Sequence, residues 1–278
     1  MTSIAVSQAT STRVLMVILI AAMTQSIVVG LHESVHALSC LMVGHRVVEY
    51  SALHVDCEPG DALSTPTKVV AGSAAIVNLL LGTVFYLVLR SGPRLSHNGL
   101  WFLWLLMLSN WSNGFGYLIF SGLSGAGDYA TVIAGWEPVA VWQLGMLLVG
   151  AVLWLGSIWL SLRVLGQIFG GYDKAEMRSR FLNLSVPSYF GAVLMPILAG
   201  LFNTYGFLGL PAVAGILAAA GTLSPLLWMP FWFVADSFPK RQGEPLAVHF
   251  DMKWVGAAVV ICLFYVLVLG PGFMFTSA

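Results

Sequence analysis

Apolar stretches alternate with short polar segments along the whole chain. About seven of these stretches approach the ~20 apolar residues that a bilayer crossing requires. The first is longer than one straight crossing needs, and the fifth is short enough to form half of a helical hairpin. The pattern predicts an all-α polytopic transmembrane bundle of about 6–7 spans, at residues 14–43, 69–89, 100–121, 139–165, 189–202, 207–234 and 255–274.

The composition agrees with this pattern. Of 278 residues, 58% are hydrophobic and only 9% are charged, whereas a soluble domain carries roughly 25% charged residues. The chain has too little charge to cover a water-facing surface, so the lipid bilayer is its expected surroundings. The formal net charge is +0 and no dense basic cluster is present, which argues against nucleic-acid binding.

Lysine and arginine are distributed unevenly between the two sides of a seven-span bundle. One side holds Arg13, Arg90, Arg94, Arg163, Lys174, Arg178, Arg180, Lys240, Arg241 and Lys253. The other side holds only Arg46 and Lys68. Because basic residues accumulate in cytoplasmic loops, this bias predicts a multi-pass integral membrane protein with a cytoplasmic N-terminus.

The cysteines offer no obvious pairing. Cys40, Cys57 and Cys262 are far apart in the sequence and form no CxxC motif. This spacing favours neither a disulfide nor a cysteine-based zinc site.

The segment His32-Glu33-Ser34-Val35-His36 has the form HExxH. Residues four apart lie on one face of a helix, so both imidazoles can ligate one metal ion. Glu33 lies close to that face, where it can act as general base toward a water molecule that zinc polarises. Ionisable groups at membrane depth indicate function by default. The alternative is a pair of core histidines hydrogen-bonded to neighbouring helices.

A catalytic zinc ion usually takes a third protein ligand. Glu58 is one candidate, although it lies in a polar loop. Asp128 is the other, because it follows the third apolar stretch and, in a seven-span chain, lies on the same side of the membrane as the end of the first. Gly122, Gly125 and Gly127 would let the backbone bend closely around a metal. The competing interpretation is that Asp128 caps the helix that follows it.

Between these elements lies "AGSAAIVN", whose small side chains permit close helix packing in lipid. An HExxH on an apolar helix, a small-residue helix ending in Asn and a glycine-flanked Asp together resemble the site-2 protease family of intramembrane zinc metalloproteases. The resemblance implies Zn²⁺ ligation by His32, His36 and Asp128, with Glu33 as the general base.

The resemblance extends over residues 14–130. It implies a three-helix metalloprotease-like core within residues 1–135 and additional transmembrane helices in residues 136–278. The stretch "SGAGDY" has no proline, no leucine directly before Asp128 and no glycine directly after it, and no PDZ-like domain is inserted in the chain. The sequence therefore resembles a divergent branch of the family.

Two further groups of polar residues allow two interpretations each. Asn78 and Asn113 lie within apolar stretches. They either form hydrogen bonds between helices or hold the extended backbone of a substrate beside the zinc. His54, close to Asp56, is either an accessory metal contact or a solvated loop residue.

The sequence thus predicts an integral membrane zinc metalloendopeptidase that hydrolyses peptide bonds of membrane-embedded or juxtamembrane substrates. Its partner would be a membrane protein or a peptide. The alternatives are a non-catalytic membrane protein with a structural or vestigial metal site, and a metal-responsive transporter. The presence of Glu33 favours the enzyme because a structural zinc site needs no base. The lack of acids deep in the later spans disfavours a transporter.

Overall fold

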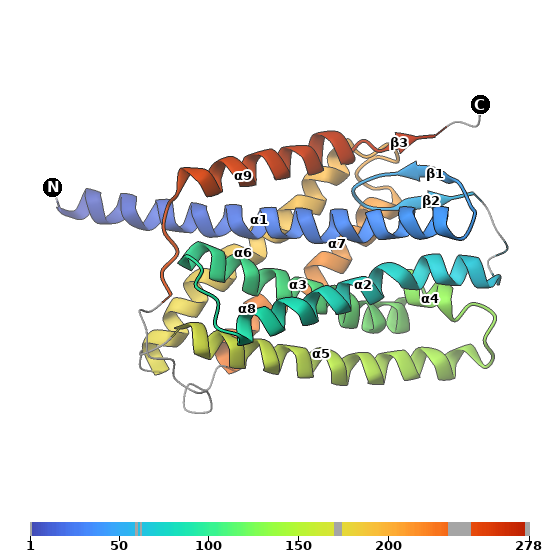
Figure 1. The fold of residues 1–278 in the computed structure, drawn as a ribbon, viewed down its shortest axis with the longest axis horizontal. Coiled ribbons are helices and arrows are strands. Elements are labelled where there is room, and N and C mark those ends of the chain that lie inside the picture. The colour runs from blue at the N-terminus through green and yellow to red at the C-terminus, as the bar shows by residue number, and fades with distance from the viewer. Residues whose placement is uncertain (1, 59–60, 62, 170–173, 233–245, 276–278) are drawn as a thin grey trace.

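The computed structural model describes residues 2–58, 61, 63–169, 174–232 and 246–275, and most of them are helical (Figure 1). A π-helical segment, η2, continues the last helix from Phe264 to Leu269. The helices are α1 (Thr2–Met42), α2 (Thr65–Arg90), α3 (His97–Ser124), α4 (Asp128–Val132), α5 (Val139–Phe169), α6 (Lys174–Phe202), α7 (Leu210–Thr222), α8 (Pro225–Trp232) and α9 (Met252–Leu263).

Six helical stretches of the described chain are long and apolar enough to cross a membrane. They are Ser11–Met42, Thr65–Arg90, Val139–Ile168, Glu176–Phe202, Leu210–Trp232 and Met252–Leu269. The outer surface agrees, because α5 exposes Leu144, Leu148, Val152 and Trp159, which would be unfavourable in water. The prediction of an all-α multi-pass membrane protein is confirmed, and six spans lie at the lower end of the predicted range.

The third predicted span, residues 100–121, lies in α3, which is not among these six. Its asparagines and serines lower its hydropathy, and it occupies the interior of the bundle against α2 and α5. The indoles of Trp101 and Trp104 stack with ring centroids 4.8 Å apart, and both residues are fully buried. Neighbouring helices therefore shield the polar residues of α3 from lipid.

A small antiparallel sheet stands beside the C-terminal end of α1 (Figure 1). Its strands are β1 (Val47–Tyr50), β2 (Val55–Cys57) and β3 (Phe273–Met274), in the order β2-β1-β3. Glu49 lies opposite Asp56 in the hairpin of β1 and β2. The sequence predicts only a polar loop for this region, because strands this short leave little alternation of apolar and polar residues.

Cys40 and Cys57 form a disulfide. The expectation of no disulfide is therefore wrong. The hairpin folds back onto the end of α1 and brings together two cysteines that are 17 residues apart. Since no CxxC motif is involved, only the tertiary contact reveals the pair. The disulfide ties β2 to the helix that carries the HExxH motif.

Candidate metal centre and its cavity

His32 and His36 lie one turn apart near the C-terminal end of α1, as the HExxH spacing predicts. Both are buried, and their Nε2 atoms lie 3.2 Å apart. The Nδ1 atom of His36 lies 2.8 Å from the carbonyl oxygen of Val70 in α2. A carbonyl only accepts hydrogen bonds, so the neutral His36 ring carries its proton on Nδ1 and presents the lone pair of Nε2 toward His32.

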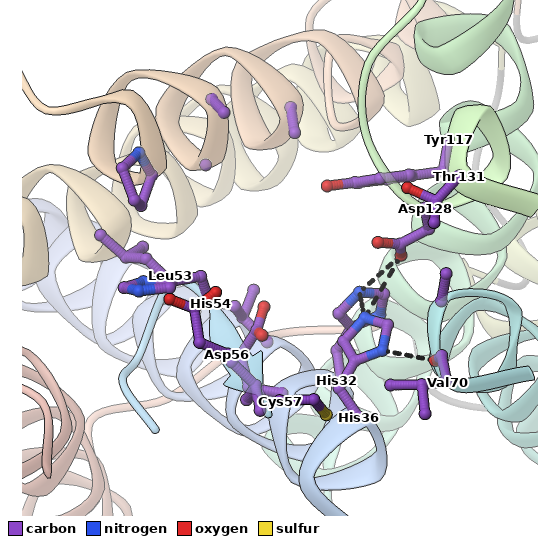
Figure 2. Close-up of a pocket in the computed structure, with 18 of the residues that line it drawn as sticks. His32, His36, Leu53, His54, Asp56, Cys57, Val70, Tyr117, Asp128 and Thr131 are labelled. Carbon is purple, nitrogen blue, oxygen red and sulfur yellow. Dashed lines mark hydrogen bonds and ion pairs between the residues drawn. The ribbon is translucent and has the colours of Figure 1, made fainter. Parts of the chain in front are cut away.

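Asp128 is the first residue of α4 and makes no capping hydrogen bond. Its Oδ2 atom instead lies 3.1 Å from His32 Nε2 and 3.4 Å from His36 Nε2 (Figure 2). Gly125 and Gly127 have φ angles of 66° and 85°, which only glycine adopts freely. These two residues turn the chain from α3 into α4 and direct Asp128 back toward α1. The structure thus favours the metal-facing interpretation of Asp128 over the capping one.

The distances within this triad fit a zinc ion. The three facing atoms are separated by 3.1, 3.2 and 3.4 Å. A tetrahedral zinc ion with bonds of about 2.0–2.1 Å separates its ligands by about 3.3 Å. His32 Nδ1 and Asp128 Oδ2 are buried and have no hydrogen-bond partner within the described residues. The three facing atoms, each of which can offer a lone pair to a metal ion, are therefore spaced like one face of a tetrahedron.

The two histidines also determine the ionisation of Asp128. Burial by itself disfavours the charged carboxylate. In the metal-free protein the histidine Nε2 atoms can carry protons and donate to the carboxylate, and these contacts outweigh burial and hold the pKa of Asp128 below its usual range; a bound metal ion would take the place of those protons. Asp128 is therefore charged at neutral pH and can serve as an anionic ligand.

Glu33 is 7% exposed and lines the same cavity as the triad. No hydrogen bond or ion pair of its carboxylate is found among the described residues, although it lies close enough to His32, His36 and Asp128 to interact with them electrostatically. A buried carboxylate without a protein partner is free to bind a water molecule in the cavity.

The other predicted residues take different positions. Asn113 lines the cavity, whereas Asn78 is 1% exposed and lies outside the cavity lining. Glu58 pairs with Arg46 at 2.9 Å, and this hydrogen bond lowers the pKa of the exposed Glu58 carboxyl. The Glu58 carboxylate is therefore paired with Arg46 and is not a member of the histidine cluster. The acid that lies next to His32 and His36 is Asp128.

His54 and Asp56 lie at the side of the cavity away from Asp128 (Figure 2). With Glu49 they form a second group whose ligand atoms lie within 4.8 Å of one another. Glu49 accepts hydrogen bonds from Tyr205 at 2.9 Å and Thr204 at 3.2 Å. The group therefore joins the hairpin to the loop between α6 and α7.

The cavity has a volume of about 590 Å³ and lies among α1, α3, α7 and the hairpin. Two of its lining residues, Gln25 and Tyr117, are not among the site residues predicted from the sequence. Gln25 lies seven and eleven residues before His32 and His36, and Tyr117 lies four residues after Asn113. Helical spacing therefore provided a signal for both.

Comparison of the chain with protein-family models, with curated proteins and with solved structures gives no match.

Proposed function

We propose that this protein is an integral membrane zinc metallopeptidase. The observation that carries the proposal is the triangle of His32 Nε2, His36 Nε2 and Asp128 Oδ2, with sides of 3.1–3.4 Å. Glu33 lies beside it in the same cavity. A purely structural zinc site would not need an unpaired buried carboxylate within reach of an open coordination position.

The proposed chemistry assigns one role to each group. A zinc ion held by the triad would polarise a water molecule and a peptide carbonyl. Glu33 takes a proton from the attacking water and delivers it to the leaving amine. The carbonyl oxygen of Val70 accepts a hydrogen bond from the Nδ1–H group of His36. This bond orients the imidazole ring and keeps Nε2 free as a ligand. Tyr117 directs its hydroxyl into the cavity (Figure 2), where it can donate to the carbonyl oxygen as that oxygen gains negative charge.

The resemblance to site-2 proteases agrees with this proposal. The three segments that carry the resemblance meet at one cavity, which is lined by His32 and His36 of α1, Ala71 of α2 and Asp128 of α4. The predicted cytoplasmic N-terminus would place the metal centre toward the opposite side of the membrane, where the sheet also lies. The disulfide between Cys40 and Cys57 supports this orientation, since disulfides persist outside the reducing cytosol.

Hydrolysis of an unfolded protein probe tests the proposal. The full-length chain in detergent micelles should cleave dye-labelled casein, lose this activity on zinc chelation and regain it when Zn²⁺ is restored. Zinc that binds at the triad without any hydrolysis would favour the non-catalytic alternative. A failure to bind zinc would exclude the enzyme and a structural zinc site, and would leave the vestigial site as the interpretation.

Tyr117→Phe should lower kcat about 100-fold because one donor to the oxyanion is removed. The Tyr117 ring lies 5.9 Å from the His32 ring, centroid to centroid, and the substitution retains that packing. The zinc content and KM for casein should therefore remain close to those of the unmodified protein. An unchanged kcat would show that the hydroxyl has no part in the reaction.

A further inference from the structure

We propose that the hairpin of β1 and β2 carries a second site for a divalent cation, formed by Glu49, His54 and Asp56. This site is separate from the candidate metal centre on α1, because His54 and Asp56 lie at the side of the cavity away from Asp128 (Figure 2). His54 is then a ligand of its own site and not an accessory contact of the first ion. The inference does not depend on the proposed function, since the hairpin would bind its cation whether or not the protein hydrolyses peptides.

The ligand atoms of the three side chains are close enough together for one ion. They all lie within 4.8 Å of one another, and His54 Nε2 lies 3.4 Å from Glu49 Oε2. An octahedral ion with bonds of about 2.1–2.4 Å separates neighbouring ligands by about 3.0–3.4 Å and opposite ligands by about 4.2–4.8 Å. The three atoms therefore fit within one coordination shell, whose remaining positions water can fill.

The two carboxylates oppose each other across the hairpin. Glu49 of β1 pairs with Asp56 of β2 in the antiparallel register, which places both side chains on one face of the sheet. Like charges directly opposite each other destabilise a sheet, and Glu49 is only 1% exposed, so water and salt screen its charge little. No lysine or arginine forms an ion pair with either carboxylate in the described part of the chain. A cation bound between them would remove this repulsion.

His54 directs a lone pair toward these carboxylates. The Ser51 hydroxyl donates its proton to the carbonyl oxygen of His54 at 2.9 Å. The hydroxyl must therefore accept the hydrogen bond that joins it to His54 Nδ1, also at 2.9 Å. The neutral ring then carries its proton on Nδ1 and a lone pair on Nε2, which is buried and has no hydrogen-bond partner within the described residues. A lone pair 3.4 Å from a carboxylate oxygen is unfavourable unless a proton or a metal ion lies between them.

The charge of the group favours a divalent cation over a proton. A proton on His54 Nε2 would compensate one carboxylate and leave the other unpaired, whereas a divalent cation compensates both. The pKa of Tyr205 is raised by its hydrogen bond to Glu49 and further by the charges of Glu49 and Asp56, which is consistent with an uncompensated negative field. One imidazole with two carboxylates is a mixed donor set, which suits a transition-metal ion such as Mn²⁺ or Zn²⁺.

The ion would crosslink the hairpin. Glu49 already accepts hydrogen bonds from Tyr205 at 2.9 Å and Thr204 at 3.2 Å, and its two carboxylate oxygens have further lone pairs for the ion. The ion thus joins both strands and, through Glu49, strengthens the link to the loop before α7. His54 and Asp56 line the cavity, which gives the ion a path to the site. The rigidity of the hairpin then depends on the divalent cations at that side of the membrane.

Electron paramagnetic resonance of Mn²⁺ tests the inference, because the sharp signal of the free ion broadens when the ion binds. The full-length His36→Ala variant in detergent micelles is the parent protein, since it lacks a ligand of the first centre. It should bind about one Mn²⁺ per chain. Adding His54→Gln or Asp56→Asn should weaken this binding at least about ten-fold. Asp56 is exposed and asparagine has nearly the same shape, so this substitution should retain the fold.

Asp61→Asn in the same parent is the matched control. Asp61 is an exposed acid in the same connection between α1 and α2. Its Oδ1 atom accepts a hydrogen bond from the backbone N–H of Leu63 at 2.9 Å, and it does not belong to the group of Glu49, His54 and Asp56. Its substitution should leave the Mn²⁺ affinity unchanged. Mn²⁺ should also slow amide hydrogen exchange in residues 47–57 of the parent, but not after Asp56→Asn.

The outcomes separate this inference from the proposed function. Absence of Mn²⁺ binding in the parent, or equal affinity after His54→Gln and Asp56→Asn, would overturn it and leave an ion pair between protonated His54 and Glu49. Equal exchange rates with and without Mn²⁺ in the parent would refute the crosslink. Binding that only the two hairpin substitutions weaken supports the site even if the unmodified protein does not cleave casein.

Discussion

Glu33→Gln is expected to abolish casein hydrolysis while zinc remains bound. The glutamine side chain has nearly the same size and shape as glutamate but cannot accept a proton from the attacking water. General-base catalysis contributes typically 10²–10⁴-fold, so we expect kcat to fall about 1,000-fold, which corresponds to about 4 kcal/mol of transition-state stabilisation. Metal analysis and kcat measured on the same preparation check both parts of the prediction.

Ser34→Ala is the matched control for this variant. Ser34 adjoins Glu33 on α1, but its hydroxyl bonds the carbonyl oxygen of Gly30 at 2.6 Å and pairs with the Tyr50 hydroxyl at 2.8 Å. It does not line the cavity, so its loss should leave kcat nearly unchanged. Loss of zinc from Glu33→Gln would contradict the assignment, because Glu33 would then be a ligand rather than a base.

Asp128→Ala is expected to cause the largest loss of zinc affinity among substitutions outside the HExxH motif. Binding free energies of structural zinc sites are about 10–16 kcal/mol for four ligands. One ligand therefore accounts for about 3 kcal/mol, or at least a 100-fold loss of affinity. The substitution also leaves His32 and His36 without the carboxylate that faces them at 3.1 and 3.4 Å. Competition with a chromophoric zinc chelator measures the change.

Glu58→Ala provides the comparison. Glu58 is an acid that lines the same cavity and was the other candidate for the third ligand, but it pairs with Arg46. Its removal should leave zinc affinity within about two-fold of the unmodified protein, as expected for an exposed ion pair of small net energy. Equal zinc affinity of Asp128→Ala and the unmodified protein would disprove the proposed third ligand.

The sheet and the disulfide determine the shape of the proposed site. The Cys40–Cys57 bond ties β2 to α1, and Glu49 binds Thr204 and Tyr205 from the loop before α7. The hairpin is thus attached both to the helix that carries the HExxH motif and to the loop that precedes α7. These links fix the position of the hairpin, which lines the cavity together with α1 and α7.

The sequence by itself determined the features that depend on short-range geometry. Apolar stretches of sufficient length identify membrane-spanning helices, because backbone groups in lipid must be paired within the segment. The four-residue spacing of His32 and His36 places both rings on one face of any α-helix. The histidine spacing holds in the structure, and so do the predicted spans except residues 100–121, whose polar side chains are buried by neighbouring helices and whose hydropathy alone does not qualify them.

Only the tertiary structure decided the contacts between distant segments. Asp128 lies ninety-two residues after His36, and its direction depends on the glycine turn between α3 and α4. The pairing of Cys40 with Cys57 depends on the fold of the hairpin, and the presence of Gln25 and Tyr117 at the site depends on the cavity that they line. In a bundle of similarly apolar helices, packing selects the neighbours, and hydropathy does not distinguish one apolar partner from another.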